Sequence, residues 1–463
     1  MAVETVTPAR FTAPLNSATG RWTVLAAVLG SSLTMLDGTI VTIALPGIGN
    51  DLGTSVAGLQ WTITGYTLTL AAFILLGGSL SDRVGRRKVF VWGVAGFALT
   101  SLLCAVAPDI ETLIAARVLQ GVAGAMVTPG SLALISASID PADRGAAVGI
   151  WSGLGGVASA AGPFLGGWLV EVTGWRSVFL INLPLAAFVI AIARNVPEST
   201  HPRAPAKIDV FGALTAAAGL GVLTYALISS TWALLGPGLA LMAAFVVIER
   251  TTGHPLVPPS LFRSRIFTAT NLVTFAVYAA LGGSVFLLAL QLQLVGGYQP
   301  LAAGLATAPV TVLMLVLSPR AGRWAQEHGP RIPMTVGPLL AALGMVLMLR
   351  IGSQPSYLSD VLPALIVFGL GLSTLVAPLT NAVLSSVPTA DAGVASGVNN
   401  AVARTSQLLA VAALPGLAGI TGYTDPGKFD HGFHTAMLMC AGMLCAGGLL
   451  SLALVHRPER TAR

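Results

Sequence analysis

The segment GGSLSDRVGRRKVF (77–90) lies between two apolar runs, at 60–80 and 89–108. A helix that crosses a bilayer needs about 20 mostly apolar residues, and both runs have that length. The segment itself gathers one acidic and four basic side chains within a few positions. This pattern predicts a tight, charged connection between two membrane-spanning helices.

The composition of the whole chain extends this prediction. Apolar residues make up 54% of the 463 residues and charged residues only 9%, with a mean hydropathy of +0.82. A soluble domain carries about 25% charged residues because water must wet its surface. A cytosolic enzyme, a disordered chain, a coiled coil and collagen are therefore excluded. The net charge of +6 does not indicate nucleic-acid binding, because the basic residues sit in short breaks between apolar runs.

Fourteen apolar runs are long enough to be read as membrane spans, including one at 176–194 and one at 392–419. The first run, 22–46, is longer than the apolar core of a signal peptide and is expected to be retained. If the N-terminus is inside, nineteen of the 24 basic residues fall on its side, three on the other side and two within spans. This asymmetry predicts that both termini are cytoplasmic. The preference for Arg, Ala and Gly suggests a bacterial source, hence a bacterial inner or plasma membrane.

The chain also repeats itself. The loop at 77–90 is echoed by AGRWAQEHGPRIPM (321–334), and PADRGAAVG (141–149) is echoed by TADAGVASG (389–397). The offset relates spans one to six to spans nine to fourteen. Parallel repeats of this kind build two halves related by a pseudo-two-fold axis along the membrane normal, with a cavity between them.

Spans seven and eight have no counterpart in the repeat and are separated by only a few residues, which predicts an inserted antiparallel hairpin. The expected division is a six-helix bundle at 1–196, a linker region with the two inserted helices at 197–265, and a second six-helix bundle with a tail at 266–463.

These features resemble the major facilitator superfamily, and within it the fourteen-helix drug:proton antiporters. The loop signature of the family is matched at seven positions, which are Gly78, Leu80, Asp82, Arg83, Gly85, Arg86 and Arg87. The exporter signature of span five is matched at Gly149, Gly162, Pro163, Gly166 and Gly167, with Ala158 where the family has glycine. RVLQGVAGA (117–125) and LDGTIVTIALP (36–46) are similar to signatures of spans four and one.

The resemblance implies an all-α membrane protein with fourteen transmembrane helices arranged as 6+2+6. It implies a secondary active transporter, and not an enzyme, that exports hydrophobic or amphipathic compounds by alternating access, driven by proton influx, as in multidrug efflux and antibiotic resistance. The alternative is an exporter of a lipid, a siderophore or a specialised metabolite on the same scaffold. Spans nine to fourteen hold no carboxylate well inside them, which favours monocationic or neutral substrates over dications.

The loop at 77–90 has two readings. Asp82 can face the positive N-terminal end of a neighbouring helix, expected at Asp391 to Gly393, and so latch the cytoplasmic side when the transporter faces outward. Alternatively, Arg86, Arg87 and Lys88 only anchor the loop on the cytoplasmic side. In span five, the glycines permit close helix packing and Pro163 bends the helix.

Three ionisable residues lie inside the predicted spans, and such residues are costly to bury in a bilayer. Asp37 lies about 13 Å from the outer end of span one and Arg117 about 12 Å from the outer end of span four. The equal depth indicates a direct or water-mediated contact. We predict that Asp37 is the proton site and that Arg117 biases its protonation; the alternative is an ion pair that only locks the two helices.

Arg404, the third residue, shares a polar stripe with Asn399, Asn400 and Gln407. It is expected to bind anionic or polar groups of the substrate, to help close the cavity, or to make structural hydrogen bonds. The predicted cavity wall adds aromatic and amide side chains, which suit amphipathic ligands. These are Gln60, Trp61, Tyr66, Asn271, Phe275, Tyr278, Gln291, Gln293 and Asn381.

The sequence predicts no cofactor other than the proton as coupling ion. His431 and His434 could share a helical face as metal ligands, but two such histidines are more often solvated, so no metal site is predicted. No GxxxxGK[ST] segment is present, so an ATP-driven pump is disfavoured. The expected partners are the lipid bilayer and a small amphipathic substrate, without nucleic acid, and the protein is expected to be monomeric.

Overall fold

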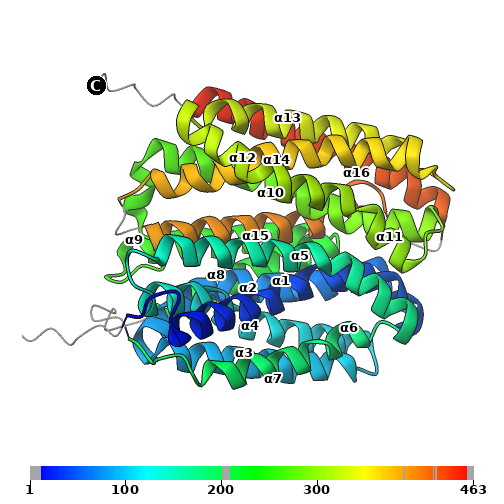
Figure 1. Cartoon of the computed structure of the whole chain (residues 1–463). Coiled ribbons are helices and arrows are strands. Elements are labelled where there is room, and N and C mark those ends of the chain that lie inside the picture. Colours follow the sequence, from blue (N-terminus) through cyan, green and yellow to red (C-terminus); the bar gives the residue numbers. More distant parts are fainter. Residues whose placement is uncertain (1–11, 201–208, 389–391, 421, 423–424, 456–463) are drawn as a thin grey trace, which may run out of the picture.

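A computed structural model describes residues 12–200, 209–388, 392–420, 422 and 425–455 (Figure 1). The described chain is helical, and its long helices run side by side. The first bundle consists of α1 (Ala18–Leu52), α2 (Val56–Val84), α3 (Arg86–Ala105), α4 (Ile110–Ser138), α5 (Arg144–Thr173), α6 (Ser177–Leu180) and α7 (Asn182–Ala193).

Helix α8 (Val210–Ile228) and helix α9 (Leu235–Thr251) follow, joined through a turn and the 3₁₀ segment η1 (Trp232–Leu234). They pack on each other closely, because a Cβ on Gly238 would lie 2.7 Å from the side chain of Leu223. α8 contacts both α2 and α15, whereas α9 contacts mainly α8. The hairpin therefore lies beside the two bundles rather than between them.

The second bundle begins with the 3₁₀ segment η2 (Pro259–Arg263). It continues with α10 (Arg265–Leu290), the π-helical η3 (Gln291–Val295), α11 (Pro300–Ala306), α12 (Ala308–His328), α13 (Arg331–Leu347), η4 (Met348–Arg350), the π-helical η5 (Tyr357–Val361), α14 (Leu362–Ser385), α15 (Ala392–Leu417) and α16 (Pro426–Leu454). In Figure 1 the first bundle lies below and the second above.

The predicted count of fourteen membrane spans is not supported. Among the described residues, twelve helices are long and apolar enough to cross a membrane. The run at 176–194 forms a shorter apolar helix over Ser177–Ala193, which is interrupted between α6 and α7, where Pro184 has no N–H to donate to the carbonyl of Leu180. The run at 392–419 forms α15, whose polar stripe lowers its apolarity although the helix lies in the centre of the molecule.

Local sequence signals set several helix ends. The side chain of Asp109 accepts a hydrogen bond from the N–H of Thr112 at 2.8 Å and so caps α4. This hydrogen bond holds the pKa of the Asp109 carboxyl below its usual value. Gly53 ends α1 with a positive φ of 59°, a conformation that glycine adopts without strain.

The bundle has two distinguishable ends. We call the end that carries the 77–90 loop, the start of α1 and the finish of α16 the basic end, on the left in Figure 1. We call the other end, which carries α6 and α11, the opposite end.

The two bundles are closed on each other at the opposite end. A Cβ on Gly304 of α11 would lie 2.2 Å from the carbonyl oxygen of Pro163 in α5, and a Cβ on Gly167 would lie 2.6 Å from the Cα of Leu301. Only glycine permits backbones to approach this closely. The side chain of Gln60 in α2 adds hydrogen bonds to the carbonyls of Val411 and Ala412 in α15, at 2.7 and 3.0 Å.

Towards the basic end, α5 separates from the second bundle. No atom lies within 4 Å of a Cβ built on Gly149, Gly153 or Gly156, and Leu154 is 47% exposed. α5 has extensive contacts with α11 but few with α12. α2 and α15 remain in contact, so the opening runs along α5 and α12. This conformation is open towards the basic end and closed at the opposite end.

Candidate functional site

Asp37 and Arg117 form an ion pair in the interior of the first bundle. Both side chains are fully buried, and Nη1 of Arg117 donates to Oδ2 of Asp37. α1 and α4 bring the two residues together from 80 positions apart. A buried charge is tolerated when a partner and hydrogen bonds compensate it, and this pair has both.

Three neutral polar side chains complete a cluster around the pair. Nε2 of Gln120 donates to Oδ1 of Asp37 at 3.1 Å, and Nδ2 of Asn182 donates to the same oxygen at 3.2 Å. Ser101 accepts from both amides, at 2.8 and 3.2 Å. With Arg117, the carboxyl of Asp37 therefore receives three N–H donors.

Arg117 is held on its other sides by α2 and α6. Its Nε donates to the carbonyl of Thr62 at 3.0 Å, and its Cζ lies 4.3 Å from the ring centroid of Tyr66 and 5.8 Å from that of Phe179. Nη1 also donates to Gln120 at 2.6 Å. Nη2 is buried and has no partner in the described structure. The guanidinium is thus well packed, but its Nη2 group remains free to donate a hydrogen bond if a neighbouring acceptor moves close to it.

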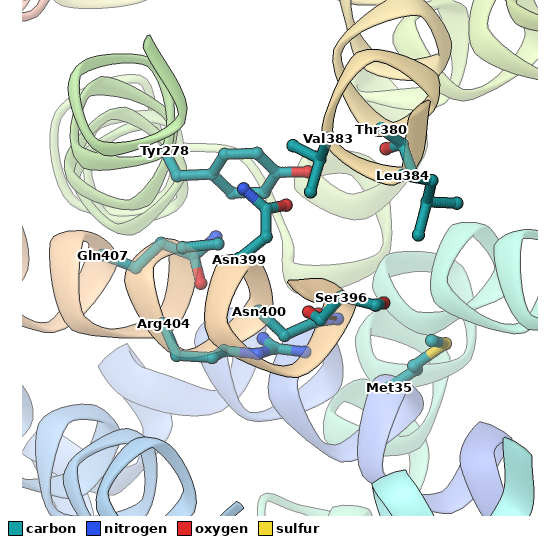
Figure 2. A pocket seen from close by; sticks show the side chains of 11 residues that line it. Met35, Tyr278, Thr380, Val383, Leu384, Ser396, Asn399, Asn400, Arg404 and Gln407 are labelled. Carbon is teal, nitrogen blue, oxygen red and sulfur yellow. Dashed lines mark hydrogen bonds between the residues drawn. The ribbon is translucent and has the colours of Figure 1, made fainter. Parts of the chain in front are cut away.

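A cavity of about 270 Å³ lies between the bundles, nearer the basic end (Figure 2). The second bundle supplies most of its wall, and Met35 of α1 supplies the facing side. The lining residues are Met35, Tyr278, Thr380, Val383, Leu384, Ser396, Asn399, Asn400, Ala403, Arg404 and Gln407. The cavity therefore combines one charged and several polar groups with an apolar wall.

The structure separates Asp37 from this cavity. Met35 lines it, but two positions along a helix reverse the direction of a side chain almost completely, and Asp37 accordingly faces the interior of the first bundle. Neither Asp37 nor Arg117 is among the lining residues. Any communication between cavity and ion pair must pass through α1 or α2.

Five of the residues predicted for substrate binding line the cavity: Tyr278, Asn399, Asn400, Arg404 and Gln407. Asn271 lies behind them and accepts a hydrogen bond from Asn399 at 3.1 Å. The others lie elsewhere. Gln60 and Gln293 each donate to backbone carbonyls of the other bundle, and Gln291 donates to Asp430. Tyr66 packs on Arg117, and Trp61 lies beside Tyr225. Phe275 is exposed, and Asn381 lies near Gly322.

The 77–90 loop is bound within its own bundle. Arg86 pairs with Asp82 at 2.8 Å, and Glu198 accepts from the backbone N–H groups of Arg87 and Lys88 at 3.0 and 3.1 Å. The predicted latch partner is the start of span thirteen, near Asp391 to Gly393; Asp391 lies outside the described residues, and Gly393 is exposed, with no atom within 4 Å of an added Cβ. Gly78 packs near Pro129 of α4, with 3.6 Å between its would-be Cβ and that of the proline.

Gly85 gives a testable prediction for this loop. Its φ is +130°, and an added Cβ would lie 2.8 Å from Oε1 of Glu198. We expect Gly85→Ala to destabilise the protein by about 1–3 kcal/mol, the usual cost of a strained backbone position. Thermal unfolding in detergent should show a lower midpoint than for Gly145→Ala, whose Cβ would meet no atom within 4 Å. Equal midpoints for the two variants would contradict the strain at Gly85.

The span-five signature divides into two parts. Gly162, Gly166 and Gly167 pack tightly, the first two on Thr39 and Ile40 of α1. Gly149 faces open space, as expected if its half of α5 packs only in the other conformation. One part of the signature thus packs against α1 and, through Gly167, against Leu301 of the second bundle, whereas Gly149 lies where α5 is separated from that bundle.

The sequence reasoning missed Gln120, Ser101 and Asn182. Gln120 follows Arg117 by three positions, so the two share a helix face, and this spacing was a usable signal. Ser101 and Asn182 come from α3 and α7 and had no comparable signal, because a single small polar residue in an apolar helix is common.

Comparison with known proteins agrees with this architecture. The model of the Major Facilitator Superfamily matches residues 27–411. The puromycin resistance protein of Streptomyces alboniger is 35% identical over 429 residues, which cover 90% of this chain and 85% of that protein. The probable actinorhodin transporter of Streptomyces coelicolor is 35% identical, and the match covers 90% of this chain and 76% of that protein. The methylenomycin A resistance protein of the same species is 33% identical, and the match covers 94% of this chain and 93% of that protein.

Among solved structures, that of a D-xylose–proton symporter superposes with a TM-score of 0.69 at 15% identity, covering 96% of this chain and all of the other. At that identity the likeness speaks for the fold alone. With the family match, it identifies an all-helical, multi-pass membrane protein that is not an enzyme. The chain belongs to the Major Facilitator Superfamily of transporters.

Proposed function

We propose that this protein exports amphipathic small molecules in exchange for protons, by alternating access of the cavity to the two sides of the membrane. The observation that carries the proposal is the buried ion pair of Asp37 and Arg117, which joins a carboxyl group to a guanidinium inside a transporter fold. The names of the relatives, which include a tetracenomycin C resistance and export protein of Streptomyces glaucescens, support export of antibiotic-like compounds.

The geometry suggests where the proton is released. In this conformation Asp37 receives donors from Arg117, Gln120 and Asn182, which suit an ionised carboxylate. The conformation is also the one open to the basic end. We therefore assign proton release to the basic-end-open state, and proton uptake to the state in which Arg117 has withdrawn.

The direction of transport follows from the orientation that we propose. Basic loops gather on the cytoplasmic side of membrane proteins, so the basic end would be cytoplasmic, with both termini there. A proton taken up outside and released inside would drive the substrate outward. The proposal needs no cofactor besides the proton, places the chain in a bacterial plasma membrane and does not require an oligomer.

An exporter of a lipid, a siderophore or a self-made metabolite on the same scaffold is the second candidate. This candidate is supported by a relative that is named for a single compound, the probable actinorhodin transporter of Streptomyces coelicolor. The two candidates differ in the compound and not in the mechanism, so one assay addresses both.

The test is efflux from proteoliposomes loaded with a panel of compounds, including puromycin, tetracenomycin C, actinorhodin and a lipophilic cationic dye. The proposal predicts that an imposed proton gradient accelerates efflux of at least one compound, and that collapsing the gradient with an ionophore removes the acceleration. Efflux that is indifferent to the gradient for every transported compound would overturn proton coupling.

A further inference from the structure

The cavity contains an arginine whose charge is not neutralised by any of the described residues. Arg404 makes no hydrogen bond or ion pair with any described residue, although it is only partly exposed. Arg117, the other arginine inside the bundles that the sequence singled out, pairs with a carboxylate and donates to two further oxygens. A charge inside a membrane protein is costly and is normally paired, so an unpaired one that faces a cavity indicates a ligand of opposite charge.

The remaining groups of the cavity do not compensate this charge. Among the described lining residues, none is a carboxylate. The nearest acidic residue on α1, Asp37, is fully buried behind Met35 and is already paired with Arg117. Arg404 therefore gives the described wall of this cavity a net positive charge.

The arrangement of the wall defines the shape of the ligand. Asn400, Arg404 and Gln407 stand at helical spacing on one face of α15, where Figure 2 shows them together. Across the cavity stand Val383 and Leu384 of α14. Thr380 of α14 also lines the cavity, but its hydroxyl donates to the carbonyl of Val376 at 3.0 Å. α14 therefore offers mainly apolar contact, and α15 supplies the hydrogen-bond donors.

The donors have a common preference. A guanidinium carries five N–H groups in a planar fork that matches a carboxylate or a similar oxyanion with two parallel hydrogen bonds. Gln407 makes no side-chain hydrogen bond to a described residue, and its amide is free to donate to the same group or to a neighbouring oxygen. A cationic head group would instead meet repulsion from Arg404 and find no carboxylate.

We propose that the cavity binds amphipathic compounds through an acidic group, a carboxylate, phenolate or sulfonate, held by Arg404 and flanked by Gln407 and Asn400, with an apolar body against Val383 and Leu384. This differs from the monocationic or neutral substrates favoured by the sequence. The proposal rests on the proposed function in one respect, because it takes this cavity as the site of the transported substrate. Binding of the acidic group does not depend on proton coupling.

Three probes with the same aromatic body test the charge preference: 2-naphthoate, 2-naphthamide and (2-naphthyl)methylammonium. Binding to the purified full-length protein in nanodiscs is measured by titration calorimetry without a proton gradient. We expect naphthoate to bind about ten-fold or more tightly than the ammonium, since a charge-assisted pair is lost in the latter. Arg404→Lys should keep the preference, and Arg404→Gln should lose it.

Asn400→Asp provides a test that does not remove the arginine. It places a carboxylate one helical turn from Arg404, where it can pair with the guanidinium. We expect this variant to weaken naphthoate binding about ten-fold and to strengthen ammonium binding. Arg320→Gln, on α12 outside the cavity lining, serves as the control for loss of a positive charge and should leave all three affinities unchanged.

Naphthoate binding no tighter than ammonium binding in the unmodified protein, or the same preference in Asn400→Asp, would overturn the proposal. Failure of the proposed function gives a different result: naphthoate would bind with the expected charge preference, but its efflux from proteoliposomes would not respond to a proton gradient.

Discussion

Asp37→Asn is expected to abolish coupling between the proton gradient and substrate movement. For each proton exchanged per substrate, a gradient of one pH unit contributes about 1.4 kcal/mol, or a ten-fold concentration ratio. An asparagine keeps the size of the side chain and accepts one hydrogen bond, but it cannot take up a proton. The variant should let the substrate equilibrate across the membrane, with no gradient-driven concentration ratio.

The measurement is the steady-state substrate ratio in proteoliposomes at several imposed pH differences, with the membrane potential clamped. The matched control is Asp51→Asn, on the same helix, because Asp51 is 48% exposed and pairs with Arg176 at the opposite end. The control should follow the unmodified protein. A substrate ratio in Asp37→Asn that still rises with the pH difference would place the proton site elsewhere.

Loss of folding would imitate loss of coupling and needs its own control. Removing one partner of a buried ion pair costs about 3–5 kcal/mol, because the other charge is left uncompensated. We therefore expect Asp37→Asn to lower the unfolding midpoint, and the double variant Asp37→Asn with Arg117→Gln to recover much of it. The double variant should remain uncoupled, which separates the role of Asp37 in coupling from its role in stability.

Gly304→Val is expected to disfavour the conformation described here by forcing α5 and α11 apart. A Cβ at this position would lie 2.2 Å from the backbone oxygen of Pro163, and a backbone atom cannot move aside as a flexible side chain can. The closed seam at the opposite end would open, and the equilibrium would shift towards the other conformation. Because transport needs both conformations, the rate should fall about ten-fold or more.

Spin labels at Val172 and Leu305, which are exposed near the ends of α5 and α11, report the width of this seam. The distance distribution should move to longer values in Gly304→Val. Gly442→Val, whose added Cβ would meet no atom within 4 Å, should leave it unchanged. An unaltered distribution in Gly304→Val, in a variant that folds, would contradict the assignment of this seam as a gate.

Gly153→Val is expected to affect the open seam, where α5 is separated from the second bundle. Its Cβ meets no atom in the present conformation, so the variant should be as stable as the unmodified protein. If the basic halves of α5 and α12 close on each other in the other conformation, the added bulk would obstruct that closure. The variant should then hold the transporter open at the basic end, the reverse of Gly304→Val.

The membrane class and the fold could be read from the sequence, because they depend on apolar runs and on glycine-rich loops that leave local signals. The approach of Asp37 to Arg117 was also predictable, since equal depth along two helices follows from the rise per residue. The position of the pair inside one bundle was not, because it depends on the rotation of α1, which turns Met35 and not Asp37 to the cavity.

The count of spans failed for a related reason. A run of apolar residues does not reveal that Pro184 interrupts a helix, and a central helix such as α15 can be polar because its neighbours shield it. Likewise, the sequence showed Arg404 within a span but not that no described side chain pairs with it. That property depends on which side chains the other helices bring near it.

Proton movement driven by substrate tests the central claim most directly. Proteoliposomes with an internal pH indicator, without any initial pH difference, receive a gradient of a transported compound. The account predicts that export of the compound moves protons in the opposite direction in the unmodified protein, and that Asp37→Asn moves none. Substrate movement without proton movement in the unmodified protein would contradict the account.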